Sequence, residues 1–357
     1  MKHLEERNQK IIDALIEKAN RVCPGTLALI GIYGSFMTGD TYEKSDLDLL
    51  VLINDDKGWQ LGQAFIQDDM QVGHDIYCTN WESLQNDAGY NNPNISKLMD
   101  SKIVYSADEK YIEQLEALRQ KVRDKLNQPF SKEDYLKAEH LLKEAEHFYA
   151  MAMIAETLSD VWAQTGNAIY YIENAIAMLN KKYFRYGTKR VYEELESMEH
   201  RPHDLCEMIE QVLSANSMEA VKQYLTILMK ETIRVFEKVK QTVTDTKKPV
   251  AAENISGTYE EMYSNWRNKM YAAAKQNNRH LAFMSLNSLN GMISEIGDEA
   301  AIEQYDVLGG YDPSNLQKTA EAYDEILKKY LKEYEKADIP VKHYSDIDAF
   351  VREYGKI

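Results

Sequence analysis

Three aspartates and a glycine-serine pair in the N-terminal part of the chain have the residue types needed for phosphate chemistry. The segment IYGSFMTGDTYEKSDLDLLVLI, residues 32–53, places Gly34 and Ser35 after one apolar run and Asp46 and Asp48 at the start of the next. Side chains at positions i and i+2 of a strand point the same way, so the two aspartates are predicted to share one face. Such carboxylates repel each other unless a cation lies between them, and Mg²⁺ accepts an all-oxygen environment.

A third aspartate, Asp75, lies in the apolar run QVGHDIYCT, where burying a lone carboxylate would be costly. If this strand lies beside the strand of Asp46 and Asp48, Asp75 completes a two-metal site and acts on an attacking hydroxyl. The turn at Gly34 and Ser35 can present backbone N–H groups and a hydroxyl to a phosphate. The alternative is that the first two aspartates merely begin a strand and that Asp75 faces solvent. The combination of all these features favours the catalytic interpretation.

Short apolar runs bounded by turn residues predict the strands of a small mixed sheet. These runs cover residues 26–34, 46–53, 71–79 and 102–106. An amphipathic stripe predicts a helix over residues 11–22, and a capping pattern predicts another helix after Asn80. Residues 1–110 are therefore predicted to form a small α/β domain with flanking helices.

The rest of the chain has helical periodicity almost to its end. Ser131 begins a predicted capping box, Asp312 is the predicted N-cap of a late helix, and the aperiodic segment 242–257 is a predicted linker. We expect an all-α helical bundle over residues 111–245. A C-terminal helical region, residues 258–357, either forms a third domain or packs into the same bundle.

Composition narrows the class of protein. The 357 residues include 42 basic and 58 acidic residues, a net charge of −16 that argues against a nucleic-acid backbone as the main partner. No apolar run is long enough to predict a membrane span, and the polar N-terminus does not predict a signal peptide. The odd number of widely spaced cysteines does not predict a disulfide framework, so a cytoplasmic location is expected.

The motif residues of the α/β region form a pattern found in one superfamily. The pattern consists of Gly34-Ser35, Gly39, Ser45-Asp46-Leu47-Asp48 and Asp75. It resembles the DNA polymerase β-like nucleotidyltransferases. An α/β nucleotidyltransferase domain followed by a helical bundle is also similar to the kanamycin and lincosamide nucleotidyltransferases within that superfamily. The motif resemblance covers about residues 26–80.

The resemblance implies a role for each matching residue. Asp46 and Asp48 would hold two Mg²⁺ ions, with Asp75 as the third catalytic carboxylate and a further metal ligand. Gly34 and Ser35 would hold the triphosphate of an NTP, with ATP as the expected donor.

One departure from the family pattern changes where the positive charge must come from. Many members carry an arginine in the Gly-Ser loop, where this chain has Phe-Met-Thr at residues 36–38. Phosphate neutralisation is then expected from Lys44, next to Ser45, from a distant Lys or Arg, or from the metals alone. The basic segment 181–190 could contact phosphate, although a solvated helix end is the favoured interpretation.

In the antibiotic-modifying relatives, a glutamate of the helical domain helps to deprotonate the acceptor hydroxyl, and the site can form across a homodimer. Glu146 and Glu173 are the candidates here, because both lie among apolar residues at helical spacing. Partial burial would raise a carboxyl pKa toward the range useful to a general base. Glu146 ranks first because it lies early in the helical region. The alternative for each is a glutamate at the edge of a bundle core.

The expected function is nucleotidyl transfer of the EC 2.7.7 type. An NTP would donate its nucleoside monophosphate to a hydroxyl of a small molecule, with release of pyrophosphate. The acidic composition favours a polycationic acceptor such as an aminoglycoside, and with it a role in antibiotic resistance. Two alternatives stay open at this point: an acceptor that is a protein side chain, and a non-catalytic nucleotide-binding or interaction module.

Overall fold

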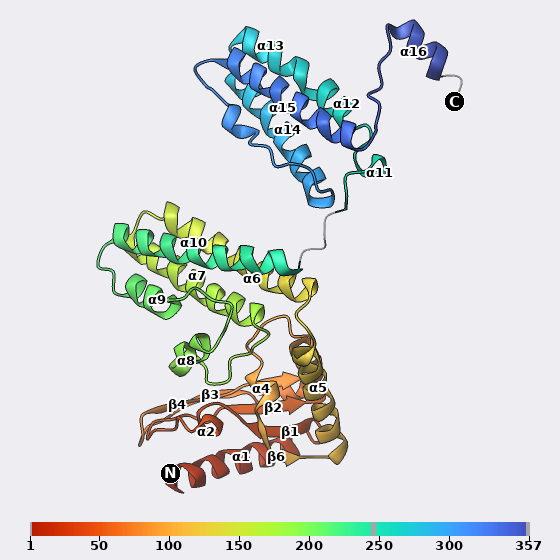
Figure 1. The fold of residues 1–357 in the computed structure, drawn as a ribbon. Helices are drawn as coiled ribbons and strands as arrows, with labels where there is room; N and C mark the ends of the chain where they lie inside the picture. The colour runs from red at the N-terminus through yellow and green to blue at the C-terminus, as the bar shows by residue number, and fades with distance from the viewer. Residues whose placement is uncertain (1, 244–247, 355–357) are drawn as a thin grey trace. The chain divides into compact units, whose positions relative to one another are not determined.

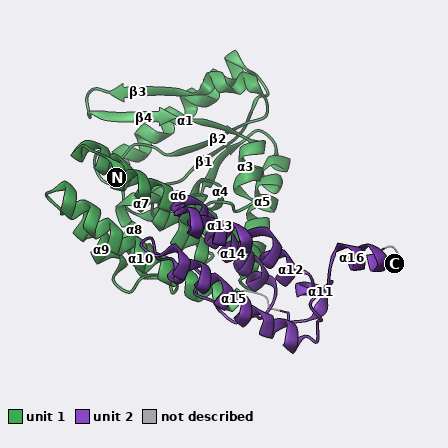
Figure 2. Ribbon diagram, turned by 90° about the horizontal axis from the view of Figure 1, so that it is seen from above, with its two compact units in different colours: residues 1–244 green, residues 245–357 purple. Residues whose placement is uncertain are grey.

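The computed structural model describes residues 2–243 and 248–354, and the chain divides into two compact units (Figures 1 and 2). Unit 1 comprises Met1–Thr244, and unit 2 comprises Asp245–Ile357. Each unit has a hydrophobic core of its own. None of the described helices is both long enough and apolar enough to cross a membrane. The cysteines Cys23, Cys78 and Cys206 are free thiols.

The N-terminal part of unit 1 is built on a four-stranded sheet with the strand order β5-β2-β1-β6. Its strands are β1 (Leu27–Ile32), β2 (Leu49–Ile53), β5 (Cys78–Asn80) and β6 (Lys102–Ser106). The sheet is mixed, because β1 pairs antiparallel with β2 and β6 whereas β2 pairs parallel with β5. The accompanying helices are α1 (Lys2–Val22), α2 (Ser35–Thr38), η1 (Asp56–Leu61), α3 (Trp81–Asp87), α4 (Ser96–Met99) and α5 (Glu109–Asn127). The predicted small α/β domain is confirmed.

A separate two-stranded hairpin corrects one prediction about this region. The hairpin consists of β3 (Gln63–Gln67) and β4 (Val72–Ile76), and the predicted strand over residues 71–79 is interrupted between β4 and β5. Asp75 therefore lies on a strand that pairs with β3, and only β5 pairs with β2. The condition for Asp75 to complete the site from a neighbouring strand, that its strand lies beside the strand of Asp46 and Asp48, is therefore not met. The reason is the tight turn over residues 68–71, in which Gln71 has a φ of 53° and returns the chain onto β3.

The C-terminal part of unit 1 is helical. Its helices are α6 (Lys132–Ile154), α7 (Leu158–Leu179), η2 (Thr188–Arg190), α8 (Val191–Glu196), α9 (Leu205–Leu213) and α10 (Met218–Val243). Helix α6 begins at the predicted capping box: the Ser131 hydroxyl accepts a hydrogen bond from Asp134 N, and the Asp134 carboxylate accepts one from Ser131 N. Helices α6 and α7 are in extensive contact, and both contain fully buried alanines, among them Ala145 and Ala168.

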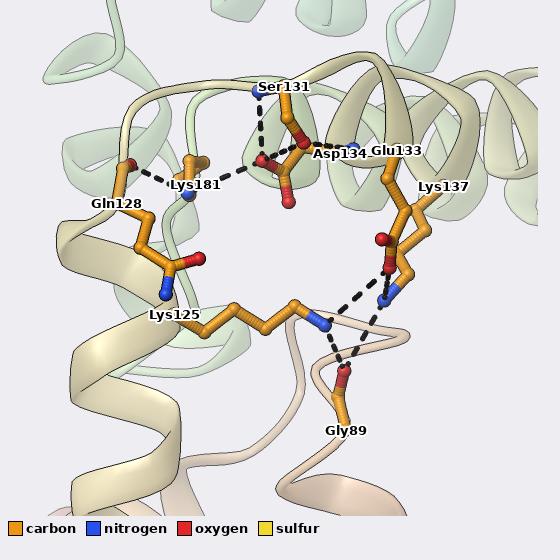
Figure 3. A network of polar contacts seen from close by, with 8 residues as sticks. All are labelled: Gly89, Lys125, Gln128, Ser131, Glu133, Asp134, Lys137 and Lys181. Atoms are coloured by element: carbon orange, nitrogen blue, oxygen red, sulfur yellow. Dashed lines mark hydrogen bonds and ion pairs between the residues drawn. The ribbon is translucent and has the colours of Figure 1, made fainter.

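Polar contacts join the α/β part of unit 1 to its helical part (Figure 3). Lys125 Nζ lies 3.0 Å and Lys137 Nζ 3.5 Å from the backbone oxygen of Gly89. Lys181 Nζ donates a 2.8 Å hydrogen bond to the carbonyl of Gln128 at the end of α5, and within the helical part it lies 3.3 Å from the largely buried Asp134 carboxylate. Buried residues of the sheet and of the helices also belong to one continuous core. The predicted border near residue 110 therefore lies inside one compact unit.

Unit 2 is helical. Its helices are α11 (Ala252–Ile255), α12 (Thr258–Met262), the π-helical turn η3 (Tyr263–Arg267), α13 (Asn268–Gln276), α14 (Arg279–Glu299), η4 (Leu308–Gly310), α15 (Leu316–Lys336) and α16 (Ile347–Tyr354). The predicted linker 242–257 contains α11, whose Ile255 is fully buried in this core, and its residues 244–247 lie outside the described residues. Helix α15 begins after Asn315 rather than at Asp312, because the Asn315 side chain accepts a hydrogen bond from Lys318 N.

Candidate functional site

The glycine-serine turn lies against the Asp48 carboxylate. Gly34 follows β1 with a φ of 66°, a conformation that favours glycine. A Cβ on Gly34 would lie 1.9 Å from Asp48 Oδ2, so no other residue fits there without moving the carboxylate. The extended backbone before β2 is held in place by a 3.1 Å hydrogen bond from Tyr33 N to the Asp48 carbonyl. The Ser35 hydroxyl is buried and has no hydrogen-bond partner among the described residues.

Asp46 and Asp48 interact electrostatically, but the prediction that they lie on a strand was wrong, because β2 begins at Leu49 and both aspartates precede it. Asp46 is exposed and Asp48 is half-buried. Burial raises the pKa of Asp48, and the neighbouring charge of Asp46 raises it further. A backbone hydrogen bond from Ser35 and the charge of Lys189 act in the opposite direction. The net effect disfavours the ionised form of Asp48, so a bound cation would relieve the repulsion between the two carboxylates.

Tyr33 links the three aspartates. Burial and, after it, the charges of Asp48, Asp46 and Asp75, in that order, together raise the pKa of Tyr33 to about 12. All three carboxylates thus lie within electrostatic range of one phenol, even though Asp75 belongs to the separate hairpin. The structure supports their common neighbourhood, and the catalytic role of each aspartate stays a prediction.

The carboxylate pair fits a hard divalent cation that is bound together with phosphate. No three His, Cys, Asp or Glu side chains of the described residues lie together in a way that could hold a metal ion. Protein sites for Mg²⁺ commonly supply one or two carboxylates and leave the other positions to substrate phosphates and water. Asp46 and Asp48 are donors of this kind, and the unpartnered Ser35 hydroxyl lies on the adjoining turn. Two bound ions, with Asp75 as a further ligand, stay a prediction.

Two basic side chains of η2 approach this turn from the helical part of unit 1. Arg190 Nη1 lies 3.4 Å from Asp40 Oδ1, just after the Gly-Ser loop, and Lys189 Nζ lies 4.8 Å from the centroid of the Tyr42 ring. Lys189 also lowers the pKa of Asp48, although burial and Asp46 outweigh it. This basic segment therefore contacts the loop that lacks its own arginine. Arg190 also pairs with Glu193, so Lys189 is the better candidate for positive charge that is available to a phosphate there.

Lys44 and Ser45 differ in their surroundings. Lys44 is exposed, whereas Ser45 is buried. The Ser45 hydroxyl accepts a 2.9 Å hydrogen bond from Tyr42 N, and its carbonyl oxygen accepts one of 2.7 Å from Arg7 Nη2. Ser45 therefore holds the backbone that leads into Asp46. The nucleotide-binding role predicted for Lys44 and Ser45 stays a prediction.

The two candidate bases lie on different helices. Glu146 is in α6 and partly exposed, whereas Glu173 is in α7, where burial raises its pKa to about 7. Glu173 lies near Tyr192 and Cys206, since its charge adds to the effect of burial in raising the pKa values of both groups. In the described part of the chain, neither glutamate shows a direct contact with Asp46, Asp48 or Asp75, so the role of each as a base stays a prediction.

Sequence reasoning did not single out Tyr33, Asp40, Lys189 or Arg190. Tyr33 directly precedes Gly34, so its position next to the motif was an available signal. Arg190 lies 150 residues from Asp40, and the only signal for it was the basic composition of its segment. Its pairing depends on how the helical part packs against the α/β part.

One family model matches the part of the chain that contains the three aspartates and the Gly-Ser turn. Residues 9–144, less than half of the chain, match the family model of the nucleotidyltransferase domain. A solved structure that the chain resembles is a nucleotidyltransferase-like protein from Exiguobacterium sibiricum 255-15. The likeness covers 81% of this chain and 92% of that chain, with 11% sequence identity and a TM-score of 0.36. No curated protein matches the chain.

Proposed function

We propose, from the premise that residues 9–144 form a nucleotidyltransferase domain, that this protein transfers a nucleoside monophosphate from an NTP to a hydroxyl acceptor. The observation that carries the proposal is the close packing of Gly34 on Asp48, with Asp46 and Asp75 in the surroundings of the same tyrosine, Tyr33. This arrangement supplies carboxylates for a metal ion beside an unpartnered hydroxyl for a phosphate.

In this proposal, Asp46 and Asp48 hold Mg²⁺, which would neutralise charge on the triphosphate and on the leaving pyrophosphate. The Ser35 hydroxyl, buried and without a partner among the described residues, donates a hydrogen bond to a phosphate oxygen. Lys189 supplies positive charge near Asp48, where the Gly-Ser loop has none. Asp75 orients the attacking hydroxyl. We take ATP as the donor to test first.

Glu173 is the better supported general base in this proposal, although Glu146 ranked first by sequence. Burial raises the pKa of Glu173 to about 7, which suits a group that accepts a proton near neutral pH. Glu173 lies near Tyr192. Tyr192 is two residues after Arg190, and the Arg190 guanidinium pairs with Asp40 beside the Gly-Ser loop. Glu173 is thus close to the segment that also carries Arg190.

The acceptor in this proposal is a cationic small molecule of the aminoglycoside kind. The chain carries a net charge of −16, and Asp46 and Asp75 are both exposed. An acidic surface steers cationic substrates toward a site and raises the rate of their association.

The experiment measures transfer of label from ATP labelled at the α-phosphate, with Mg²⁺, to a panel of aminoglycosides and neutral polyols. We expect labelled aminoglycoside and stoichiometric pyrophosphate, and neither product with Asp46→Asn. If label appears only on a protein, the acceptor is a protein side chain rather than a small molecule. Nucleotide binding that is independent of Mg²⁺, with no turnover of any acceptor, would overturn the enzymatic proposal.

A further inference from the structure

A cavity of about 450 Å³ lies between α1 and the β3–β4 hairpin. One face of α1 lines it, through residues at the i, i+3, i+4 spacing of a helix. These residues are Arg7, Lys10, Ile11, Ala14, Leu15 and Lys18. The hairpin contributes every second residue of β3, namely Gln63, Phe65 and Gln67. The volume lies in the range of small-molecule sites, which is about 300–1,000 Å³.

The ionisable side chains that line this cavity have one sign, although the charge of Asp46 also acts on Arg7 from outside the lining. Every ionisable side chain that lines it in the described part of the chain is basic: Arg7, Lys10 and Lys18. The lining between them is mainly apolar, and the whole chain carries a net charge of −16. Basic side chains around an apolar cavity in an acidic protein are complementary to an anion with an apolar body.

Arg7 is the most unusual member of the lining. Its side chain is buried, with 7% of the residue exposed. Nη2 donates to the Ser45 carbonyl and to Asn8 Oδ1, whereas Nη1 is buried and has no partner among the described residues. A buried guanidinium with an unused donor is costly unless an acceptor reaches it. Lys10 also lines the cavity and lies three residues further along the same helix face, about 4.5 Å along the helix axis from Arg7.

We propose that this cavity binds an amphipathic monocarboxylate with an aliphatic body, its carboxylate at the Arg7–Lys10 end and its chain against Ile11, Ala14 and Phe65. Lys18 is eleven residues from Arg7, about 16 Å along the helix axis, so a single carboxylate does not reach both. The guanidinium fork is well matched to a carboxylate. The proposal therefore places the charged group at one defined end.

The cavity is connected to the proposed catalytic residues in two ways. Arg7 binds the carbonyl of Ser45, the residue before Asp46. On β4, Val72 and His74 are buried whereas Asp75 is exposed, so Asp75 projects from the hairpin face opposite to the buried one. A ligand in the cavity contacts Arg7, which holds the backbone before Asp46, and the hairpin that carries Asp75. Its binding is therefore expected to change the affinity for NTP. This second consequence rests on the proposed function, whereas the binding itself does not.

The test is calorimetric titration of the full chain, without nucleotide, with three amphiphiles of equal chain length: decanoate, decanol and decyltrimethylammonium. We expect one decanoate per chain, binding about tenfold weaker for decanol because it lacks the charge, and no binding of the cation. Lys10→Gln should weaken decanoate binding about tenfold, and Lys18→Gln should leave it within about twofold. Equal binding of all three amphiphiles, or a larger effect of Lys18→Gln, would overturn the proposal.

A steric variant tests the location. Ala14→Trp fills the cavity from an exposed helix position and should abolish decanoate binding, whereas Asn20→Trp, on an exposed position of the same helix outside the lining, should not. If decanoate still binds Ala14→Trp, the proposed site is contradicted. If the unaltered chain forms a dimer that Ala14→Trp cannot form, a second copy of the chain occupies the cavity, and the proposal is contradicted as well. An NTP affinity that is unchanged by saturating decanoate would overturn the coupling alone.

Discussion

The Asp48 carboxylate occupies the space that a side chain on Gly34 would need. A Cβ at position 34 would lie 1.9 Å from Asp48 Oδ2 and 2.6 Å from its Cγ. The turn that ends β1 and the carboxylate that precedes β2 are therefore in direct contact. Under the proposed function, a phosphate bound at the turn would lie beside the Asp48 carboxylate, which is proposed to hold Mg²⁺.

Substitution of Gly34 tests this contact. Gly34→Ala should reduce pyrophosphate release about 100-fold, because displacing a catalytic group by about 1 Å has an effect of this size. Gly187→Ala is the matched control, since Gly187 has a backbone conformation close to that of Gly34, with φ 66° and ψ −166° against φ 66° and ψ −145°, but nothing lies within 4 Å of its Cβ position. Both variants therefore bear similar backbone strain, of about 1–3 kcal/mol. Equal loss of activity in the two variants would show that strain, not contact with Asp48, is responsible.

Neutralising the paired carboxylates should separate activity from stability. Asp46→Asn and Asp48→Asn should each abolish Mg²⁺-dependent pyrophosphate release, because each removes half of the charge that holds the cation. The free energy of unfolding should stay the same or rise, since the repulsion that raises the pKa of Asp48 is removed. Asp69→Asn, at an exposed position of the hairpin turn, is the control. Full activity of either variant would contradict the mechanism.

Glu173 should make stability depend on pH in a predictable direction. Its pKa is raised from 4.5 to about 7 by burial, so between these values the native state binds a proton that the unfolded chain releases. The free energy of unfolding should therefore fall as the pH rises through this range, and part of this decline should be absent in Glu173→Gln. Urea unfolding at about pH 5 and about pH 8 measures the difference.

The same substitution tests the role of Glu173 as a base. Glu173→Gln should lower kcat and remove the rise of kcat with pH near neutrality, with little change in the KM for NTP. Glu146→Gln is the parallel substitution at the other candidate. If Glu146→Gln loses the pH-dependent limb and Glu173→Gln keeps it, the assignment is reversed.

Lys189 should contribute to NTP binding. Lys189→Met removes the positive charge that acts on Asp48, so it should raise the KM for NTP about tenfold with a smaller effect on kcat. Lys182→Met is the control, because Lys182 is an exposed lysine of the same basic segment. Similar KM values for the two variants would contradict a specific role of Lys189.

The capping box of α6 should be important for the stability of unit 1. Asp134 is 7% exposed, caps α6 through Ser131 and pairs with Lys181. Asp134→Ala leaves the Lys181 charge without its partner, so the free energy of unfolding should fall by about 3 kcal/mol. Glu133→Ala, whose side chain is 73% exposed, should lower it by less than about 1 kcal/mol. Chemical denaturation compares the two, and equal effects would contradict a special role for Asp134.

The sequence by itself determined the local parts of this protein. Gly34 and Ser35 lie within fifteen residues of Asp46 and Asp48 along the chain, and the apolar runs beside them predict β1 and β2. The capping box at Ser131 was predicted for the same reason, since its two hydrogen bonds join residues three apart. Periodicity, caps and short motifs all act over distances that a sequence window contains.

Only the tertiary structure decided which distant parts meet. Strand β3 escaped prediction because its run, QAFIQ, is short and mostly exposed, and its pairing moved Asp75 off the main sheet. Arg190 meets Asp40 across 150 residues, and Arg7 meets Ser45 across 38. Such contacts depend on how whole elements pack against each other, which no local sequence pattern specifies. They bring Lys189 and Arg190 to the Gly-Ser loop, and they form the cavity with basic residues between α1 and the hairpin that carries Asp75.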